Sequence, residues 1–503
     1  MPFPRPVVLI HGYADRGQSF EGWRQSLTAL GANAVMLNVC TYITLNNEVT
    51  ITDIGEALDR ALEYELKWED GRPREFDAIV HSTGMLVLRS WLVRYKGRRG
   101  QLKHLVGLAP ATFGSPLAQK GRSLLGSIFR GNHDPLSPDF LNAGDRVLDA
   151  LELGSSFTWD LTHRDLLADP PFYTTGSDTP YVAVFVGDTP YTGIREVINE
   201  PGTDGTVRWA GAGFDTRKIT VDLTRIPAGS AGKQTVAMSP WANGRLEIPI
   251  IGVPGANHAT ILSDAGSTSV GGVSLAQLVG EFLENVSTED AFSGWLARAR
   301  SYGSRALQTM DASGDPDARG WQQFVIRALD ENGDPITDYS VTLCRDATGL
   351  PGAVLQEFEE DVHPYRADPS FRCFHVNLPI EVLPSESGTG PQSAETSQQH
   401  LYIRLNASTG TPLLQYQPYD GQGKPIPLNP KNGDVMLDIT SLTTDKDRLF
   451  FPYTTTLIEI RMNRETLPLD AVSQLLYFLD DKGKPLSRES PWWLSRLLAP
   501  GLN

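Results

Sequence analysis

The stretch Asp77-Ala-Ile-Val-His-Ser-Thr-Gly-Met85 decides the expected fold. Its apolar first half predicts a buried strand, and residues 85–95 predict the helix that follows. Ser82 stands at the turn between them. On such a turn a serine can present its Oγ at the edge of a sheet, beside backbone N–H groups that stabilise an oxyanion. A serine between a strand and a helix is more often a simple helix N-cap, so this stretch alone leaves both interpretations open.

Two further segments favour the catalytic interpretation of Ser82. Residues 7–15 (VVLIHGYAD) predict a strand that ends at His-Gly, where the N–H of Tyr13 would point at the same substrate oxygen as the N–H of Thr83. Residues 254–260 (PGANHAT) predict a loop after a strand, and they place His258 where it can act as general base.

A carboxylate that orients the histidine is expected between Ser82 and His258 in the sequence. Asp204, in the segment 202–207 (GTDGTV), and Asp188, directly after a predicted strand, are the two candidates. Asp204 is favoured because the Asp-Gly-x-Val pattern predicts a tight turn that aims the carboxylate back at the site. Asp188 is then expected to be a supporting or turn residue.

The first 300 residues alternate short apolar strands with helices, which predicts a mostly parallel sheet covered on both faces. The expected strands are 7–11, 34–40, 77–80, 104–108, 181–186 and 247–253, and the expected helices between them are 53–68 and 85–95. An insertion over about 114–178 predicts a cap of short helices at 120–130, 138–153 and 156–167. The first of these is either an ordinary packed helix or a mobile lid with an apolar underside, formed by Leu124, Leu125, Ile128 and Phe129.

From about residue 311 the pattern changes to short alternating strands separated by Pro, Gly, Asp and Ser. The spacing Asp-x-x-Gly-x-Pro recurs at 330–335, 420–425 and 480–485, and it is typical of hairpin turns. We therefore expect a catalytic unit over 1–300 and an all-β, sandwich-like accessory unit over 311–503.

Residues 7–15, 80–85, 202–207 and 254–260 together resemble the α/β-hydrolase superfamily, specifically its lipase and esterase branch. The segments 109–118 and 151–157 also resemble bacterial lipases, so the resemblance covers a little over half of the chain. It implies an acyl-enzyme mechanism on lipid esters, with Ser82 as nucleophile, His258 as base, Asp204 as its orienting acid, and Tyr13 and Thr83 as oxyanion donors. Val80 departs from the family pattern, which usually has glycine there.

Composition narrows the classes of partner. The 60 acidic and 44 basic residues give a net charge of −16, which argues against binding to a nucleic-acid backbone. We expect an acyl-ester substrate with at most transient contact at a lipid interface, and the partner of the β-rich unit stays open. The sequence has no dinucleotide fingerprint or phosphate loop, so no cofactor is expected. No metal is expected either, although His133 and His163 leave a structural metal in the cap open.

The start of the sequence has no charged-then-apolar leader, and no apolar run approaches the ~20 residues that span a bilayer. A soluble protein is therefore expected, either cytoplasmic or exported by a route independent of a signal peptide. Two alternatives to a general lipase stay open. One is a phospholipase delivered by such a route, and the other is a non-catalytic binding protein on an inactivated hydrolase fold.

Overall fold

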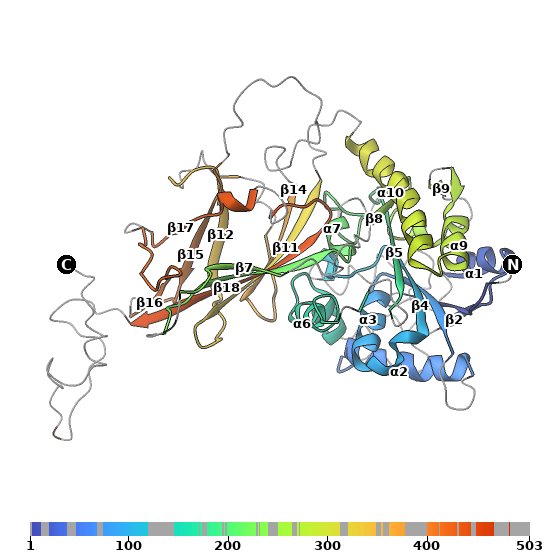
Figure 1. Cartoon of the computed structure of the whole chain (residues 1–503), viewed down its shortest axis with the longest axis horizontal. Helices are drawn as coiled ribbons and strands as arrows, with labels where there is room; N and C mark the ends of the chain where they lie inside the picture. The colour runs from blue at the N-terminus through green and yellow to red at the C-terminus, as the bar shows by residue number, and fades with distance from the viewer. Residues whose placement is uncertain are drawn as a thin grey trace.

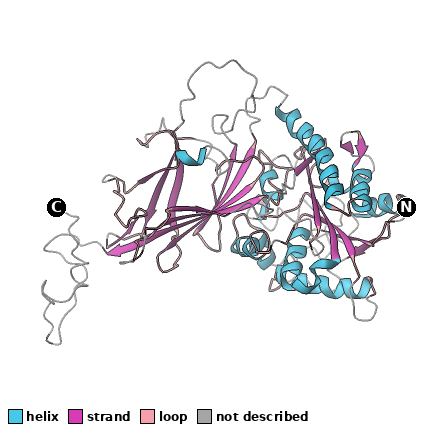
Figure 2. Cartoon of the chain, viewed as in Figure 1, coloured by secondary structure: helices cyan, strands magenta, loops and turns pink. Residues whose placement is uncertain are grey.

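Two sheet systems and the helices around them form the structure, a computed structural model of the chain (Figures 1 and 2). The described residues are 3–11, 20–37, 47–67, 74–118, 145–170, 172–173, 179–193, 196, 199–227, 230, 232–239, 250–263, 269–270, 272–311, 320–348, 354–355, 362–377, 400–411, 413–429, 432–443, 449–466 and 482.

The expected parallel sheet is present in the N-terminal half. Its six strands all run parallel, so their carboxyl ends meet at one edge. In spatial order they are β2 (Ala34–Leu37), β1 (Val7–Ile10), β3 (Phe76–His81), β4 (Leu102–Leu108), β5 (Tyr181–Gly187) and β8 (Ile250–Val253).

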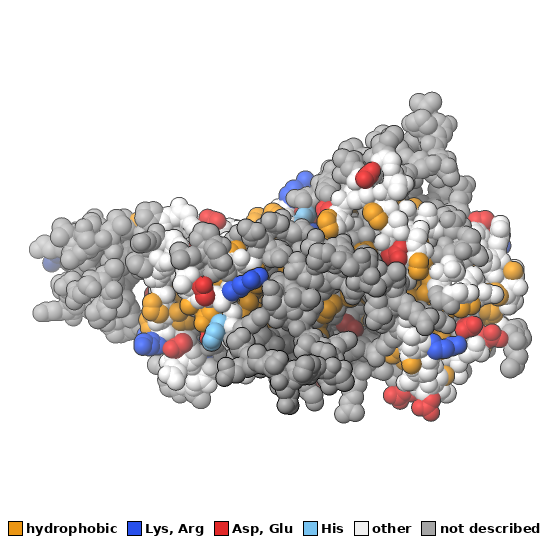
Figure 3. All heavy atoms as spheres, turned by 90° about the horizontal axis from the view of Figure 1, so that it is seen from above, with side chains coloured by type: hydrophobic (Ala, Val, Ile, Leu, Met, Phe, Trp, Pro, Cys, Tyr) orange, Lys and Arg blue, Asp and Glu red, His pale blue; other side chains and the backbone are white. Residues whose placement is uncertain are grey.

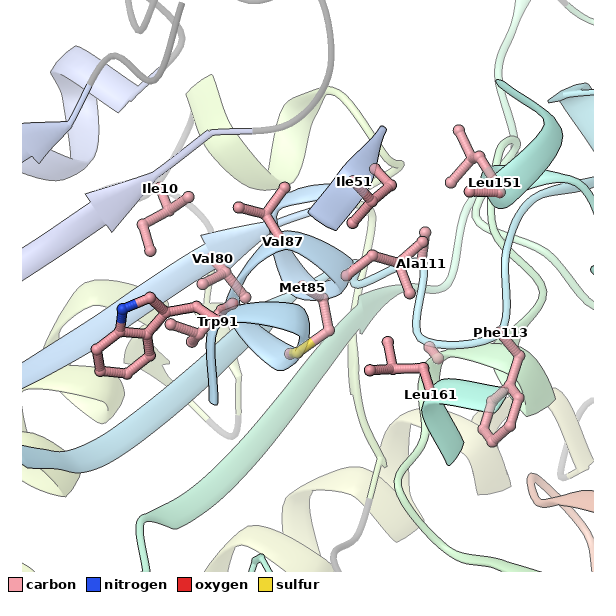
Figure 4. Packing of buried hydrophobic residues seen from close by; sticks show 14 of the residues in the cluster. Ile10, Ile51, Val80, Met85, Val87, Trp91, Ala111, Phe113, Leu151 and Leu161 are labelled. Carbon is pink, nitrogen blue, oxygen red and sulfur yellow. The ribbon is translucent and has the colours of Figure 1, made fainter. Parts of the chain in front are cut away.

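Alternate residues of these strands enter two different cores, because successive side chains of a strand point to opposite faces. Val8, Ile10 and Val80 belong to one core, with helices α2 (Ile51–Glu65) and α3 (Gly84–Arg94), as Figure 4 shows for several of its members. The odd-numbered partners, such as Val7 and Ile79, belong to the other core. That core includes residues of α1 (Glu21–Ala29), α9 (Leu275–Asn285) and α10 (Glu289–Asp311).

The described part of the cap insertion contains a helix within each of the expected ranges 138–153 and 156–167. They are α5 (Asp145–Leu151) and α6 (Ser156–Arg164), and a short 3₁₀ turn precedes them at Pro116–Ala118. The side chain of Ser155 caps α6 by accepting from the N–H of Thr158. The lid candidates Leu124, Leu125, Ile128 and Phe129 lie outside the described residues.

A buried ion pair ties α6 to α3. The guanidinium of Arg89 donates to both carboxylate oxygens of Asp165 at 2.7 and 2.9 Å, and both side chains are fully buried. Arg89 also donates to the carbonyl of Thr112, and the hydroxyl of Tyr173 donates to Asp165. The helix that follows Ser82 is thus fixed to the cap and to the loop after β4.

The C-terminal half forms the expected β-sandwich. One sheet has seven strands, β13 (Val362–Pro364), β14 (Phe371–Asn377), β11 (Trp321–Asp330), β18 (Thr455–Thr466), β6 (Thr216–Leu223) and β7 (Val236–Met238) in order, with β16 (Leu414–Gln417) also beside β18. The other sheet has three, β12 (Asp338–Cys344), β15 (Tyr402–Ser408) and β17 (Val435–Asp438). Side chains from both sheets form a shared apolar core.

Strands β6 and β7 precede β8 in the chain, yet they belong to the C-terminal sheet. β6 pairs in parallel with β18, from Thr216↔Thr455 to Leu223↔Met462. A cut near residues 300–311 therefore does not separate the two sheets, and the division into units 1–300 and 311–503 stays a prediction. The opposite face of the same sheet contributes Val325, Cys373 and Leu457 to the core of the N-terminal half, so the two halves share apolar packing.

Two of the three predicted hairpin turns lie within the described residues. In the first, the carboxylate of Asp330 accepts from the N–H groups of Asn332 and Asp334, and Gly333 has φ +88°. In the second, Asp420 and Gly423 (φ +78°) repeat this arrangement. The third, at 480–485, is not described apart from residue 482.

The remaining elements are short. They are α7 (Trp209–Ala212), α8 (Thr260–Ser263), β9 (Ser269–Val270), β10 (Val273–Ser274) and the 3₁₀ segments Lys96–Gln101 and Thr440–Thr443. Among the helices of the described residues, none combines the length and the apolar character needed to cross a bilayer. On the face in Figure 3 the described Lys and Arg side chains are scattered rather than gathered into one patch.

Candidate active site

Ser82 occupies a sharp turn at the carboxyl end of β3. Its φ is +52°, in the left-handed region that residues with a Cβ rarely adopt, and α3 begins two residues later. The N-cap of α3 is Thr83 rather than Ser82, and the helix has no side-chain cap. Backbone hydrogen bonds hold the turn, from Ser82 N to the carbonyl of Leu108 (3.3 Å) and to the carbonyl of Ser82 from Ala111 N (3.1 Å) and Met85 N (3.2 Å).

Gly84 allows strand β1 to approach this turn closely. A Cβ at Gly84 would lie 2.8 Å from the carbonyl oxygen of Ile10 and 3.1 Å from that of His11. Because these are backbone atoms, the start of α3 fits against the end of β1 only with glycine at this position. The chain continues from His11 to Gly12 and Tyr13. Tyr13, the expected second oxyanion donor, lies outside the described residues.

Val80 fits the turn without a glycine at its own position. It is fully buried, and Gly107 of β4 lies opposite it in the strand register. A Cβ at Gly107 would lie 2.9 Å from Pro110 Cγ and 3.0 Å from Met85 Cε. The space above Gly107 is therefore filled by the side chains of Pro110 and Met85, which only a glycine at position 107 admits.

His258 and Asp204 are brought together although 54 residues separate them. The Nδ1 of His258 lies 2.9 Å from Oδ2 of Asp204, and both side chains are buried. A carboxylate only accepts, so Nδ1 carries the proton of this hydrogen bond. In the neutral ring Nε2 then has a lone pair and can accept a proton from a nucleophile.

The carboxylate of Asp204 is fixed by its own turn. Its Oδ1 accepts from the N–H groups of Thr206 (3.0 Å) and Val207 (2.7 Å), while the backbone carbonyl of Asp204 accepts from the N–H of His258 (3.0 Å). Gly205 has φ +94°, and a Cβ there would lie 2.6 Å from the ring of Tyr191. The Asp-Gly sequence therefore produces the tight turn that the pattern predicts.

Asp188, the competing candidate, lies elsewhere. Its Oδ1 accepts from the N–H of Gly255 (2.8 Å) and from the hydroxyl of Thr189 (2.9 Å). Burial raises the pKa of this carboxyl above its usual range. Asp188 thus supports the turn before His258.

His81 is a residue whose contribution the sequence did not reveal. Its Nε2 donates to the backbone carbonyl of His258 (3.0 Å), and the two rings lie 4.6 Å apart between centroids. Burial lowers the pKa of His81 well below 6.5, so the ring is neutral. Because His81 adjoins Ser82, these contacts place His258 beside the turn at the end of β3. In the sequence, only the place of His81 directly before Ser82 could have indicated that it contacts His258.

Other candidate groups lie apart from this cluster. The Nδ1 of His163 lies 2.8 Å from the carbonyl of Trp159 within α6, and His133 lies outside the described residues. Cys344 and Cys373 are buried, and neither is joined in a disulfide to another described residue. In the described ranges, no group of three or more His, Cys, Asp or Glu side chains is arranged to hold a metal ion.

Comparison with solved structures relates this architecture to known proteins. Over 96% of this chain and 98% of the other, it superimposes on phospholipase PlaB from Legionella pneumophila with a TM-score of 0.68 and 20% identity. A second structure of that protein, in complex with thio-NAD, gives 0.67 at 20% identity over 96% of this chain and all of the other. The fold is that of the α/β-hydrolases.

A weaker structural match is found with Bacillus licheniformis lipase BlEst2 in its mature form. That structure is 16% identical, has a TM-score of 0.34, and matches 53% of this chain and 91% of the other. The expected α/β-hydrolase fold is confirmed by the match to PlaB. No protein-family model matches the chain, and no curated protein matches it in sequence.

Proposed function

We propose that the chain is a lipolytic carboxylic-ester hydrolase that works through an acyl-enzyme on Ser82. The observation that carries the proposal is the left-handed conformation of Ser82 (φ +52°) at a strand-to-helix turn, beside a buried His258–Asp204 pair. A strained serine at such a turn is typical of a nucleophile whose Oγ must face the substrate.

In the proposed reaction, Ser82 Oγ attacks the ester carbonyl carbon while its proton passes to His258 Nε2. Asp204 holds the imidazole in the required tautomer and stabilises the imidazolium. The carbonyl oxygen becomes an oxyanion, for which the N–H groups of Thr83 and Tyr13 are the proposed donors, each contributing about 3 kcal/mol. The intermediate then expels the alcohol, which takes the proton from His258. Water repeats the sequence on the acyl-enzyme and releases the carboxylic acid.

A phospholipid is the proposed substrate class within this reaction. PlaB is named as a phospholipase, and its match to this chain includes the C-terminal sheets as well as the parallel sheet. This gives phospholipid more support than triacylglycerol. The proposed lid residues Leu124, Leu125, Ile128 and Phe129 would cover the acyl chain.

Hydrolysis of p-nitrophenyl esters from C2 to C16 tests the reaction, together with labelling by a fluorophosphonate. Ser82→Ala is expected to lose activity by several orders of magnitude and to lose labelling. Ser90→Ala changes a buried serine of the same helix and serves as the matched control, with activity retained. A wild type that is inert on every ester, with and without detergent, would favour the non-catalytic binding protein.

Fatty-acid release from phosphatidylcholine vesicles, compared with a triolein emulsion, tests the substrate class. We expect faster release from the vesicles, abolished by Ser82→Ala. Faster release from triolein would replace the phospholipase proposal with that of a general lipase. A preference for acetyl over longer esters would remove the lipid substrate altogether.

A further inference from the structure

The turn that carries Asp204 rests on the C-terminal sheet. We propose that Trp321 and His375 of that sheet are positioning residues for Asp204, acting through Gly202, so that the β-rich half takes part in aligning the catalytic acid. This inference rests on the proposed hydrolase function. The name acid loop is used for residues 200–208.

Gly202 is the contact point between the acid loop and the sheet. Trp321 of β11 and His375 of β14 stack with ring centroids 4.3 Å apart and an interplanar angle of 25°. A Cβ at Gly202 would lie 2.6 Å from Trp321 Cδ2 and 2.8 Å from His375 Cε1. The backbone of Gly202, at φ +69°, therefore lies directly against these stacked rings, two residues before Asp204.

Further contacts hold the end of the acid loop and the short helix α7 on the same sheet. Arg208, almost fully buried, directs Nη1 toward Cys373 Sγ (3.7 Å) and Nη2 toward the carboxylate of Glu200 (3.3 Å). The hydroxyl of Thr455 donates to the carbonyl of Ala210 (2.8 Å). A Cβ at Gly211 would lie 3.2 Å from the side-chain amide of Gln323.

The parallel-sheet half holds the other side of the acid loop. The hydroxyl of Ser115 donates to the carbonyl of Thr206 (2.6 Å), and the hydroxyls of Tyr191 and Thr206 lie 3.0 Å apart. Trp209 Nε1 donates to the carbonyl of Gly187 at the end of β5 (2.9 Å). The acid loop is thus fixed from two sides, and on the side of the C-terminal sheet the stacked pair supports Gly202 while Cys373 contacts Arg208.

This support matters because the Asp204–His258 hydrogen bond tolerates little displacement. Misplacement of a reacting group by about 1 Å can cost roughly 100-fold in rate. A gap beneath Gly202 would let the acid loop sink toward the sheet and draw Asp204 away from Nδ1 of His258. Binding of the ester does not depend on this alignment, so the loss is expected in kcat rather than in KM.

The test compares Trp321→Val in the wild type and in an Asp204→Asn background, by kcat and KM on a p-nitrophenyl ester. Alone, Trp321→Val is expected to lower kcat by about 10- to 100-fold with little change in KM. In the Asp204→Asn background it is expected to lower kcat by less than about threefold, because the interaction it supports is already absent. Trp321→Phe keeps a flat ring under Gly202 and is expected to recover most of the loss.

Phe324→Val is the matched control, because Phe324 lies on the same strand but belongs to the core between the two C-terminal sheets. It removes a buried ring without touching the acid loop, so its kcat is expected to stay near that of the wild type. Should Trp321→Val fail to fold, Gly202→Ala is used instead. Its Cβ would push against the same rings from the other side, and the same dependence on the Asp204 background is expected.

Two outcomes would overturn the inference. One is a folded Trp321→Val or Gly202→Ala with unchanged kcat. The other is an equal loss in both backgrounds, which would indicate a general structural effect. Failure of the proposed function is distinguishable from either, because the wild type would then be inert on every ester or Ser82→Ala would retain the wild-type activity.

Discussion

At the scale of single residues, the candidate site contains a strained backbone at Ser82 and a buried, neutral histidine at His81, and neighbouring residues hold both in place. Ser82 adopts a left-handed conformation that costs on the order of 1 to 3 kcal/mol, and backbone hydrogen bonds to Leu108 and Ala111 hold it there. His81 is buried without charge beneath His258. Predictions at this scale concern single side chains and the charges they carry.

Asp204 and Asp188 are predicted to differ sharply when each is changed to asparagine. Asp204→Asn is expected to lower kcat by about 10⁴-fold, because the amide no longer holds His258 in the tautomer that accepts the serine proton. Asp188→Asn keeps an oxygen that accepts from the N–H of Gly255, so its loss is expected to stay below about tenfold. Steady-state kinetics of the two variants checks this. Equal losses would contradict the assignment of Asp204 as the acid.

His81 makes the stability of the protein sensitive to acid. Burial lowers its folded-state pKa below 6.5, so the unfolded chain takes up a proton first as the pH falls through that value. The free energy of unfolding therefore falls below about pH 6.5, by at most about 1.4 kcal/mol per pH unit from this residue. Above that pH the contribution does not change.

Urea unfolding of the wild type and of His81→Gln from pH 8 to pH 5 isolates this contribution, since all other groups are common to both. We expect the wild type to lose more stability than the variant as the pH falls. Parallel curves would show that His81 takes up its proton equally in the folded and unfolded states.

Elements of this fold depend on short sequence signals to differing degrees. The two Asp-x-x-Gly-x-Pro turns were predictable because Gly333 and Gly423 supply the positive φ that the turn requires. Helix α2 was predictable because its apolar residues recur at helical spacing, and its capping box at Thr50 and Asp53 fixes where it begins. In these elements the determining contacts are local.

Alanine at two exposed glycines is predicted to have opposite effects. Gly333→Ala places a Cβ at φ +88° and is expected to lower the free energy of unfolding by about 1 kcal/mol, although no atom crowds the site. Gly294 lies inside helix α10, also with open space around it. Gly294→Ala is expected to raise the free energy of unfolding by about 0.5 to 1 kcal/mol. Chemical denaturation of both variants measures the difference. A destabilised Gly294→Ala would contradict the helical account.

The sequence predicted most of the parallel sheet and the segments that carry Ser82, Asp204 and His258. It did not predict that β6 joins the C-terminal sheet, although Ile219, Val221 and Leu223 alternate as a strand requires. Nor did it predict the stacked pair Trp321 and His375 beneath Gly202. Pairing between distant segments leaves no local pattern, because each partner is chosen by surfaces that form only in the folded chain.

At the scale of the whole molecule, the two halves share a core and a sheet. Val325, Cys373 and Leu457 of the C-terminal sheet pack in the same cluster as the residues around α3, and Glu152 at the end of the cap helix α5 accepts from His363 of β13. β6 pairs with β18 on one side and with β7 on the other, and Figure 1 shows β7 and β18 within the same sheet. The halves are therefore expected to unfold together.

A chain ending at residue 311 is predicted not to fold as an independent unit. It would keep β6 and β7 but lose β18, leaving one edge of β6 unpaired and its buried alternate side chains exposed. We expect association or loss of a cooperative urea transition, measured by size-exclusion chromatography and circular dichroism beside the full chain. A monomeric fragment that unfolds cooperatively and hydrolyses esters like the full chain would instead support the division at 300–311.

Because β6 pairs with β18, the C-terminal sheet cannot be completed until the ribosome has synthesised β18. Lys218 and Glu459, joined by a hydrogen bond of 2.9 Å, are 241 positions apart. At about 5 to 20 residues per second, a ribosome needs roughly 10 to 50 s to supply the second strand after the first. For that interval the nascent chain carries a strand with an open edge, which is a binding site for chaperones and for other nascent chains. We therefore expect the centre of the C-terminal sheet to close late, after residues 455–466 have left the ribosome.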